Sequence, residues 1–77
     1  MTHTPLTVAD VCDIGTAIEY LREKRHWSRE RLAHDSGSSY FLIARIEQGK
    51  NTSVRILLRI CATLDVTLAD LATLAGV

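Results

Sequence analysis

The basic side chains of this chain gather in its middle, and their types suit the binding of a polyanion. All nine Lys and Arg residues fall between positions 22 and 59, together with four of the nine acidic residues. The flanking segments 1–21 and 60–77 carry acidic residues only, so the formal net charge of the chain is zero. Phosphate binds such cations, and the planar fork of arginine also fits the O6 and N7 atoms of guanine. The distribution of charge therefore indicates nucleic-acid binding, with an ordinary solvated surface as the alternative.

A segment inside this basic region predicts two short helices that cross at a steep angle. It covers residues 29–48, RERLAHDSGSSYFLIARIEQ. Ala33 is small enough for a second helix to pass closely, and Gly37 can adopt the left-handed backbone that ends the first helix. The apolar residues of the inner face are Leu32, Ile43 and Ile46. This pattern is typical of a helix-turn-helix, whose second helix can lie in the major groove of DNA.

The apolar spacing predicts an all-α chain of five helices, over residues 14–25, 29–36, 40–48, 54–64 and 68–74. Residues that cap helix N-termini precede them, namely Asp13, Ser28, Ser39, Ser53 and Thr67. Gly15 is expected in the first turn of the first helix, where its cost is small. We expect residues 1–12 to form a loose N-terminal arm and residues 13–77 to form one domain.

Several classes of function find no support in the sequence. There is no apolar run long enough to span a membrane, and the start MTHTPLTVAD lacks the features of a secretory signal, so we expect a cytoplasmic protein. Cys12 and Cys61 belong to no CxxC pair, and the histidines show no metal-ligand spacing, so neither metal nor cofactor is expected. No nucleophile–base set or phosphate-binding glycine loop is present, which argues against an enzyme.

The chain resembles the phage repressor and Cro superfamily of helix-turn-helix regulators, also called XRE-like. The resemblance covers residues 13–73 and rests on DIGTAIEYLR, WSRERLA, Gly37, IARIEQGK and LLRICATLDVTLADL. It implies a five-helix, lambda-repressor-like domain that binds operator DNA as a symmetric dimer and usually represses transcription. It also implies a buried ion pair between Arg22 and Glu47, which would lock the first and third helices together.

The resemblance assigns DNA contacts residue by residue. Those expected to read bases from helix 40–48 are Tyr40, Phe41, Ala44 and Arg45. Those expected to meet phosphate are Arg29, Ser39, Lys50, Asn51 and Arg55. Phe41 departs from the family, which usually places polar residues there, because a phenyl ring can only contact thymine methyls or stack. The alternative is that Tyr40 and Phe41 are partly buried or meet another protein.

The last helix suggests a homodimer. Its leucines, Leu68, Leu71 and Leu74, together with the apolar chain end, exceed what one small core needs. Pairing about a two-fold axis would place two recognition helices about 34 Å apart, one turn of the duplex. The alternative is that these leucines close the core of a single chain.

The function expected from these features is sequence-specific binding of double-stranded DNA by a dimeric transcriptional repressor. One alternative is the antitoxin of a toxin–antitoxin module, since the DIG opening and the GKNTS loop look similar to HipB-type antitoxins, which bind DNA and a toxin. Controller proteins of restriction–modification systems are equally short. A protein-interaction module without a DNA role is an alternative from another class.

Overall fold

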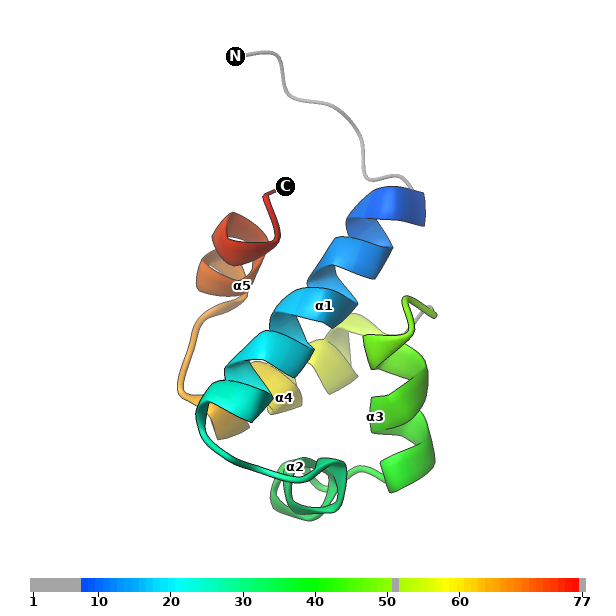
Figure 1. Ribbon diagram of the computed structural model, residues 1–77, viewed down its shortest axis with the longest axis vertical. Coiled ribbons are helices and arrows are strands. Elements are labelled where there is room, and N and C mark those ends of the chain that lie inside the picture. The colour runs from blue at the N-terminus through cyan, green and yellow to red at the C-terminus, as the bar shows by residue number, and fades with distance from the viewer. Residues whose placement is uncertain (1–7, 51, 77) are drawn as a thin grey trace.

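The computed structural model describes residues 8–50 and 52–76, which form five α-helices and contain no strand. The helices are α1 (Val8–Lys24), α2 (Arg29–Ser36), α3 (Tyr40–Glu47), α4 (Val54–Leu64) and α5 (Leu68–Ala75). The expected all-α, five-helix fold is confirmed. In Figure 1, α1 runs obliquely between α5 and α3, α4 lies behind it, and α2 closes the lower end.

One hydrophobic core joins all five helices. Each helix contributes at least one fully buried apolar side chain, and these are Ile18, Leu32, Ile43, Ile60, Leu64 and Leu71. Burial of an aliphatic side chain of this size contributes about 1.5–3 kcal/mol to folding. The core therefore fixes the positions of the helices relative to one another.

Four helices begin directly after the capping residues that the sequence predicts. The caps are Ser28, Ser39, Ser53 and Thr67, and each hydroxyl accepts a hydrogen bond from the backbone N–H three residues further on. At α5 the Asp70 carboxylate in turn accepts from the backbone N–H of Thr67, at 3.0 Å. That backbone hydrogen bond, aided by the threonine hydroxyl, lowers the pKa of Asp70. The four predicted caps are confirmed.

The turn between α2 and α3 has the conformation that a helix-turn-helix needs. Gly37 has φ +70° and ends α2 in the left-handed region. The backbone N–H of Ser38 then donates to the carbonyl of Ala33 at 2.8 Å. Ala33 itself is only 4% exposed, and α2 packs against α3. The predicted turn is confirmed.

The first helix begins earlier than the sequence analysis indicated. It starts at Val8, so Asp13 lies inside the helix and does not precede it. Residues 8–12 contain no glycine or proline that would interrupt a helix. Positions 1–7 of the expected arm lie outside the described residues.

Gly15 is placed well inside α1, and not in its first turn as expected. The backbone of the carboxyl end of α3 lies directly against it. A Cβ atom on Gly15 would overlap the carbonyl oxygen of Ile46 and lie 3.2 Å from that of Glu47. The glycine is therefore required by the close approach of two backbones, which a side chain would push apart.

We expect Gly15→Ala to lower the free energy of unfolding by about 1–3 kcal/mol, because the backbone of α3 must shift to admit a methyl group. Urea unfolding followed by circular dichroism measures this change. The sign of the change in the free energy of unfolding is the test, since a Gly to Ala substitution inside an unobstructed helix stabilises the protein by about 1 kcal/mol. A more stable variant would contradict the close packing of α1 on α3.

Candidate nucleic-acid interface

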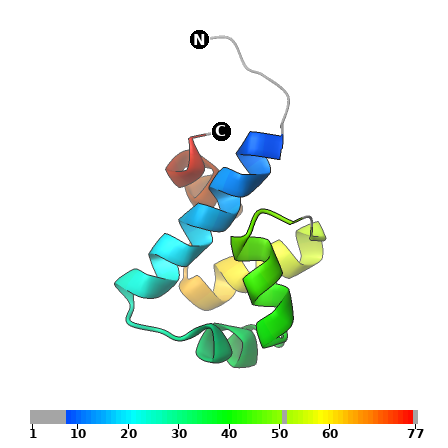
Figure 2. The same cartoon turned by 45° about the vertical axis from the view of Figure 1, so that its right-hand side comes forward.

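One side of α3 is held in the core and the opposite side faces outward. Ile43 and Ile46 are buried, whereas the side chains of Tyr40 and Phe41 are 48% and 69% exposed. Arg45, one turn after Phe41, is also exposed, and Ala44 is half-buried. In Figure 2, α3 stands at the front of the molecule with α4 passing behind it. All four residues expected to read bases thus belong to one helix whose outer side is open.

The outward face of α3 combines an aromatic ring with a cation. The guanidinium carbon of Arg45 lies 5.7 Å from the centre of the Phe41 ring, within the range of a cation–π interaction. Arg45 belongs to no ion pair among the described residues. Its charge therefore remains available to a ligand.

A buried group of charges fixes the carboxyl end of α3. The Glu47 side chain, only 1% exposed, accepts from Arg22 Nε at 2.8 Å and from Arg22 Nη2 at 3.2 Å. Arg22 also donates to the carbonyl of Trp27 at 2.7 Å. The hydrogen bond to Glu47 raises the pKa of Arg22 above its ordinary value, so the guanidinium stays charged. Arg22 and Glu47, expected to pair, thus join α1 to α3.

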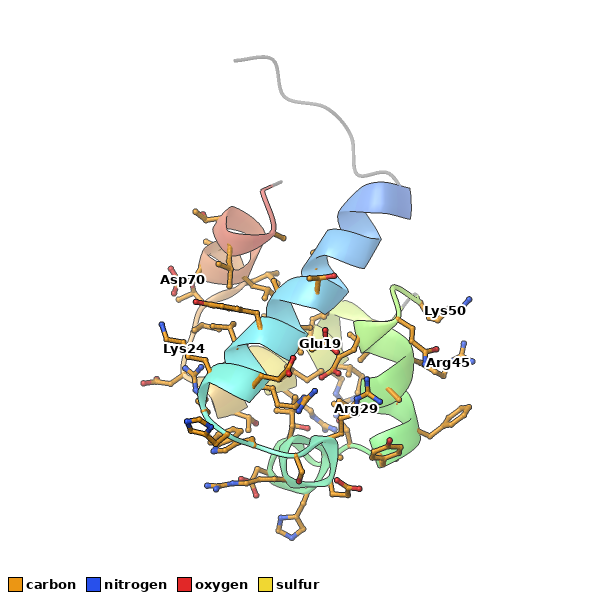
Figure 3. All side chains as sticks on the ribbon, in the orientation of Figure 1. Glu19, Lys24, Arg29, Arg45, Lys50 and Asp70 are labelled. Carbon is orange, nitrogen blue, oxygen red and sulfur yellow. The ribbon has the colours of Figure 1, made fainter. Side chains whose placement is uncertain are left out.

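Arg29 takes part in the same group of charges, which the sequence analysis did not anticipate. Its Nε donates to Glu47 Oε1 at 2.9 Å, and its Nη2 lies 3.7 Å from Glu19 Oε2. The hydrogen bond to Glu47 is also the main cause that raises the pKa of Arg29. In Figure 3, Glu19 and Arg29 meet between α1 and the two helices of the turn. Arg29, which was expected to meet phosphate, thus contacts two carboxylates, one of which it shares with Arg22.

The other residues expected to meet phosphate are differently placed. Lys50, just after α3, and Arg55, in the first turn of α4, are exposed. Figure 3 shows Lys50 and Arg45 pointing outward on the same side of the molecule. Ser39 is exposed, and its oxygen caps α3 by accepting from the N–H of Leu42 at 3.1 Å. Asn51 lies outside the described residues.

Arg25 has a structural role that the sequence analysis missed. Its guanidinium donates to the carbonyl of Leu64 at 2.6 Å and to that of Leu21 at 2.9 Å. Leu64 is the last residue of α4, so the cation lies where unpaired carbonyls give a helix its partial negative charge. Arg25 therefore ties the end of α1 to the end of α4.

The leucines of α5 do not form one surface. Leu71 is 1% exposed and packs into the core of the single chain, so it cannot serve as the dimer contact expected of it. Leu68 and Leu74 are 37% and 47% exposed. Two shallow open grooves, of about 280 and 330 Å³, meet at Leu74 and are lined by residues of α1, α5 and the turn before α5. Leu58 on α4 is equally open, at 50%, and the sequence analysis did not single it out.

The described residues contain no group of His, Cys, Asp and Glu side chains that could hold a metal ion. Cys61 is buried among apolar side chains, and this burial raises the pKa of its thiol. Cys12 has no described side chain. A search for a helix long and apolar enough to cross a membrane finds none among the described residues.

Five helices with an outward-facing α3 after a glycine turn define the class of helix-turn-helix DNA-binding domains of the phage repressor and Cro type. A family model, HTH_3, described as helix-turn-helix, matches residues 18–71, and the chain belongs to this family. The resemblance stated from the sequence is thereby confirmed.

Two solved structures similar to the chain are crystal structures of the clp gene regulator ClgR from Corynebacterium glutamicum. One has a TM-score of 0.80 at 25% identity, covering 99% of this chain and 95% of that chain. The other has a TM-score of 0.80 at 26% identity, covering 94% of this chain and 74% of that chain. No curated protein matches the sequence.

We expect Glu47→Ala to lower the free energy of unfolding by about 3–5 kcal/mol, because two arginines would lose their buried counter-charge. Denaturant unfolding measures the loss. The matched control is Glu30→Ala, which removes an exposed carboxylate from the first turn of α2 and should change stability by less than about 1 kcal/mol. Equal effects of the two substitutions would refute the anchoring role of Glu47.

Proposed function

We propose that this protein is a transcriptional regulator that binds double-stranded DNA by inserting α3 into the major groove. The observation that carries the proposal is the outward face of α3. There Phe41 and Arg45, which has no ion pair among the described residues, project from a helix whose opposite side is packed into the core. The family membership and the similarity to ClgR, a gene regulator, support it.

Contacts to phosphate would orient the helix on the duplex. Lys50 and Arg55 are the exposed cations next to α3, and Ser28 and Ser53 mark two helix N-termini whose amides carry partial positive charge. Such contacts supply affinity without sequence information, which must come from the base edges. Arg45 is the side chain suited to that reading, since it can donate to guanine O6 and N7.

The proposal includes a homodimer on a palindromic operator. A two-fold pair of chains presents two copies of α3, and a repressor that blocks a promoter gains affinity and specificity from two half-sites. Leu68 and Leu74 are the exposed leucines of α5 that such an interface would bury. The grooves beside Leu74 would receive side chains of the partner.

The antitoxin alternative has one observation in its favour. Val54 and Leu58 lie one turn apart on α4 and are 61% and 50% exposed, outside both the face of α3 and the leucines of α5. A chain that binds DNA with α3 and a second copy with α5 would still have this apolar strip for another protein. Co-purification with the product of the neighbouring reading frame separates an antitoxin from a simple repressor.

We expect the wild-type protein to form a complex with random-sequence duplex DNA at low salt, and its affinity to fall as salt rises. Lys50→Ala should lower the slope of log K against log salt by about one unit, because one phosphate contact is lost. Lys24→Ala is the matched control, since Lys24 points away on the opposite side of the molecule (Figure 3) and should leave the slope unchanged. Absence of any complex at low salt would refute DNA binding.

For the dimer, we expect Leu74→Glu to shift sedimentation from dimer to monomer, because a carboxylate would be buried without a partner. Leu58→Glu is the matched control, a leucine of nearly equal exposure on another face, and should leave the dimer intact. Dissociation by Leu58→Glu alone would place the interface on α4 and overturn the proposed use of α5.

A further inference from the structure

Phe41 is the most exposed of the large apolar side chains among the described residues, and it lies on the face of α3 that is proposed to enter the groove. A phenyl ring offers neither a donor nor an acceptor to a base edge. The one apolar group that bases present in the major groove is the methyl group on C5 of thymine. Among the groups on the base edges, the ring is therefore best suited to the methyl group of a methylated pyrimidine.

Arg45 is held next to this ring. The two residues are four positions apart on α3, so their side chains leave the same side of the helix about 6 Å apart along its axis. The guanidinium lies 5.7 Å from the ring centre, and an attraction of this kind limits the rotamers that Arg45 visits. By contrast, Arg22, Arg29 and Arg31 all pair with carboxylates.

The short side chain of Ala44 lies beside this pair and leaves room for a base pair. Ala44 follows Phe41 by three positions and precedes Arg45, and it is half-buried. A larger residue there would hold the helix away from the base edges. The outer face of α3 therefore carries an apolar ring at Phe41 and a cation at Arg45, with the short side chain of Ala44 beside them.

One arrangement of bases satisfies both side chains at once. In a step with a pyrimidine followed by guanine, the C5 substituent and the O6 and N7 atoms of guanine are neighbours on one strand in the major groove. A guanidinium bound to the guanine then lies against the methyl group, and an adjacent ring covers the rest of that methyl. Uracil and cytosine lack the group, whereas thymine and 5-methylcytosine carry it.

We infer that Phe41 and Arg45 act as one unit that reads a 5-methylpyrimidine followed by guanine, in a TpG or a 5-methyl-CpG step. The inference rests on the proposed function, because it requires α3 to lie in the major groove. It adds a specificity to that function and a consequence, namely that cytosine methylation at a CpG step strengthens binding.

The test is selection of bound duplexes from three random pools, one with the normal bases, one with deoxyuridine in place of thymidine, and one with 5-methyldeoxycytidine in place of deoxycytidine. Wild-type protein should enrich TpG over CpG in the normal pool. That preference should fall about fourfold in the deoxyuridine pool, the value of one buried methyl group. In the third pool, 5-methyl-CpG should be enriched as strongly as TpG.

Three variants locate the effect. Phe41→Ala should bind duplexes of the normal pool but show the same sequence preference in all three pools. Arg45→Ala should lower the preference for guanine by about tenfold or more. Lys24→Ala is the matched control, since Lys24 forms the equivalent aromatic–cation pair with Tyr20 on α1, at 5.9 Å, and should keep every preference of the wild type.

The outcomes separate this inference from the proposed function. Failure to bind any pool at low salt would overturn both. A sequence preference that is the same with thymine and with uracil, or that survives in Phe41→Ala, would leave the proposed function standing and overturn the reading of the methyl group.

Discussion

Glu47 ends α3, and its buried carboxylate accepts hydrogen bonds from an arginine of α1 and an arginine of α2. A carboxylate this far from water is costly unless its charge and its lone pairs are satisfied. Arg22 and Arg29 satisfy them, and no buried polar side-chain atom among the described residues lacks a hydrogen-bond partner. The position of α3 relative to two other helices is thus set by directional bonds as well as by apolar packing.

The same end of α3 is fixed by a second, purely steric constraint. The carbonyl of Ile46 lies against Gly15, so the backbones of α1 and α3 approach more closely than two side chains would allow. The hydrogen bonds of Glu47 set the orientation of α3 relative to α1 and α2, and the contact at Gly15 sets the distance between α3 and α1. Together they allow little movement of α3, and a rigid helix loses less conformational freedom when it binds.

Local features of this fold could be predicted from the sequence, and contacts between distant segments could not. The caps at Ser28 and Ser39 depend on a hydroxyl and an amide three residues apart, and Gly37 marks its turn by residue type alone. The Arg22–Glu47 contact could be expected only from the family resemblance. Arg29 was assigned to phosphate because nothing in the sequence shows that α2 brings it to Glu47.

The apolar residues show the same limit of local patterns. A leucine on an amphipathic helix follows the same spacing whether it covers the core of its own chain or a partner. Leu71 therefore could not be told from Leu74 until the packing of α5 on α1 was known. Gly15 is a similar case, because only the distance between two backbones explains it.

Folding and the proposed recognition of DNA use opposite sides of the same short helix. Ile43, Ile46 and Glu47 provide the core and charge contacts, whereas Phe41 and Arg45 contact each other and otherwise face outward. A substitution of Phe41 or Arg45 changes what α3 can bind and removes none of the hydrogen bonds of Glu47 that hold the helix in place. Because the two sides are separate, α3 can carry the exposed phenyl ring of Phe41 on the face proposed to read DNA, although this ring adds nothing to the core. A chain whose α3 was held by its outer residues could not change its binding preference without losing its fold.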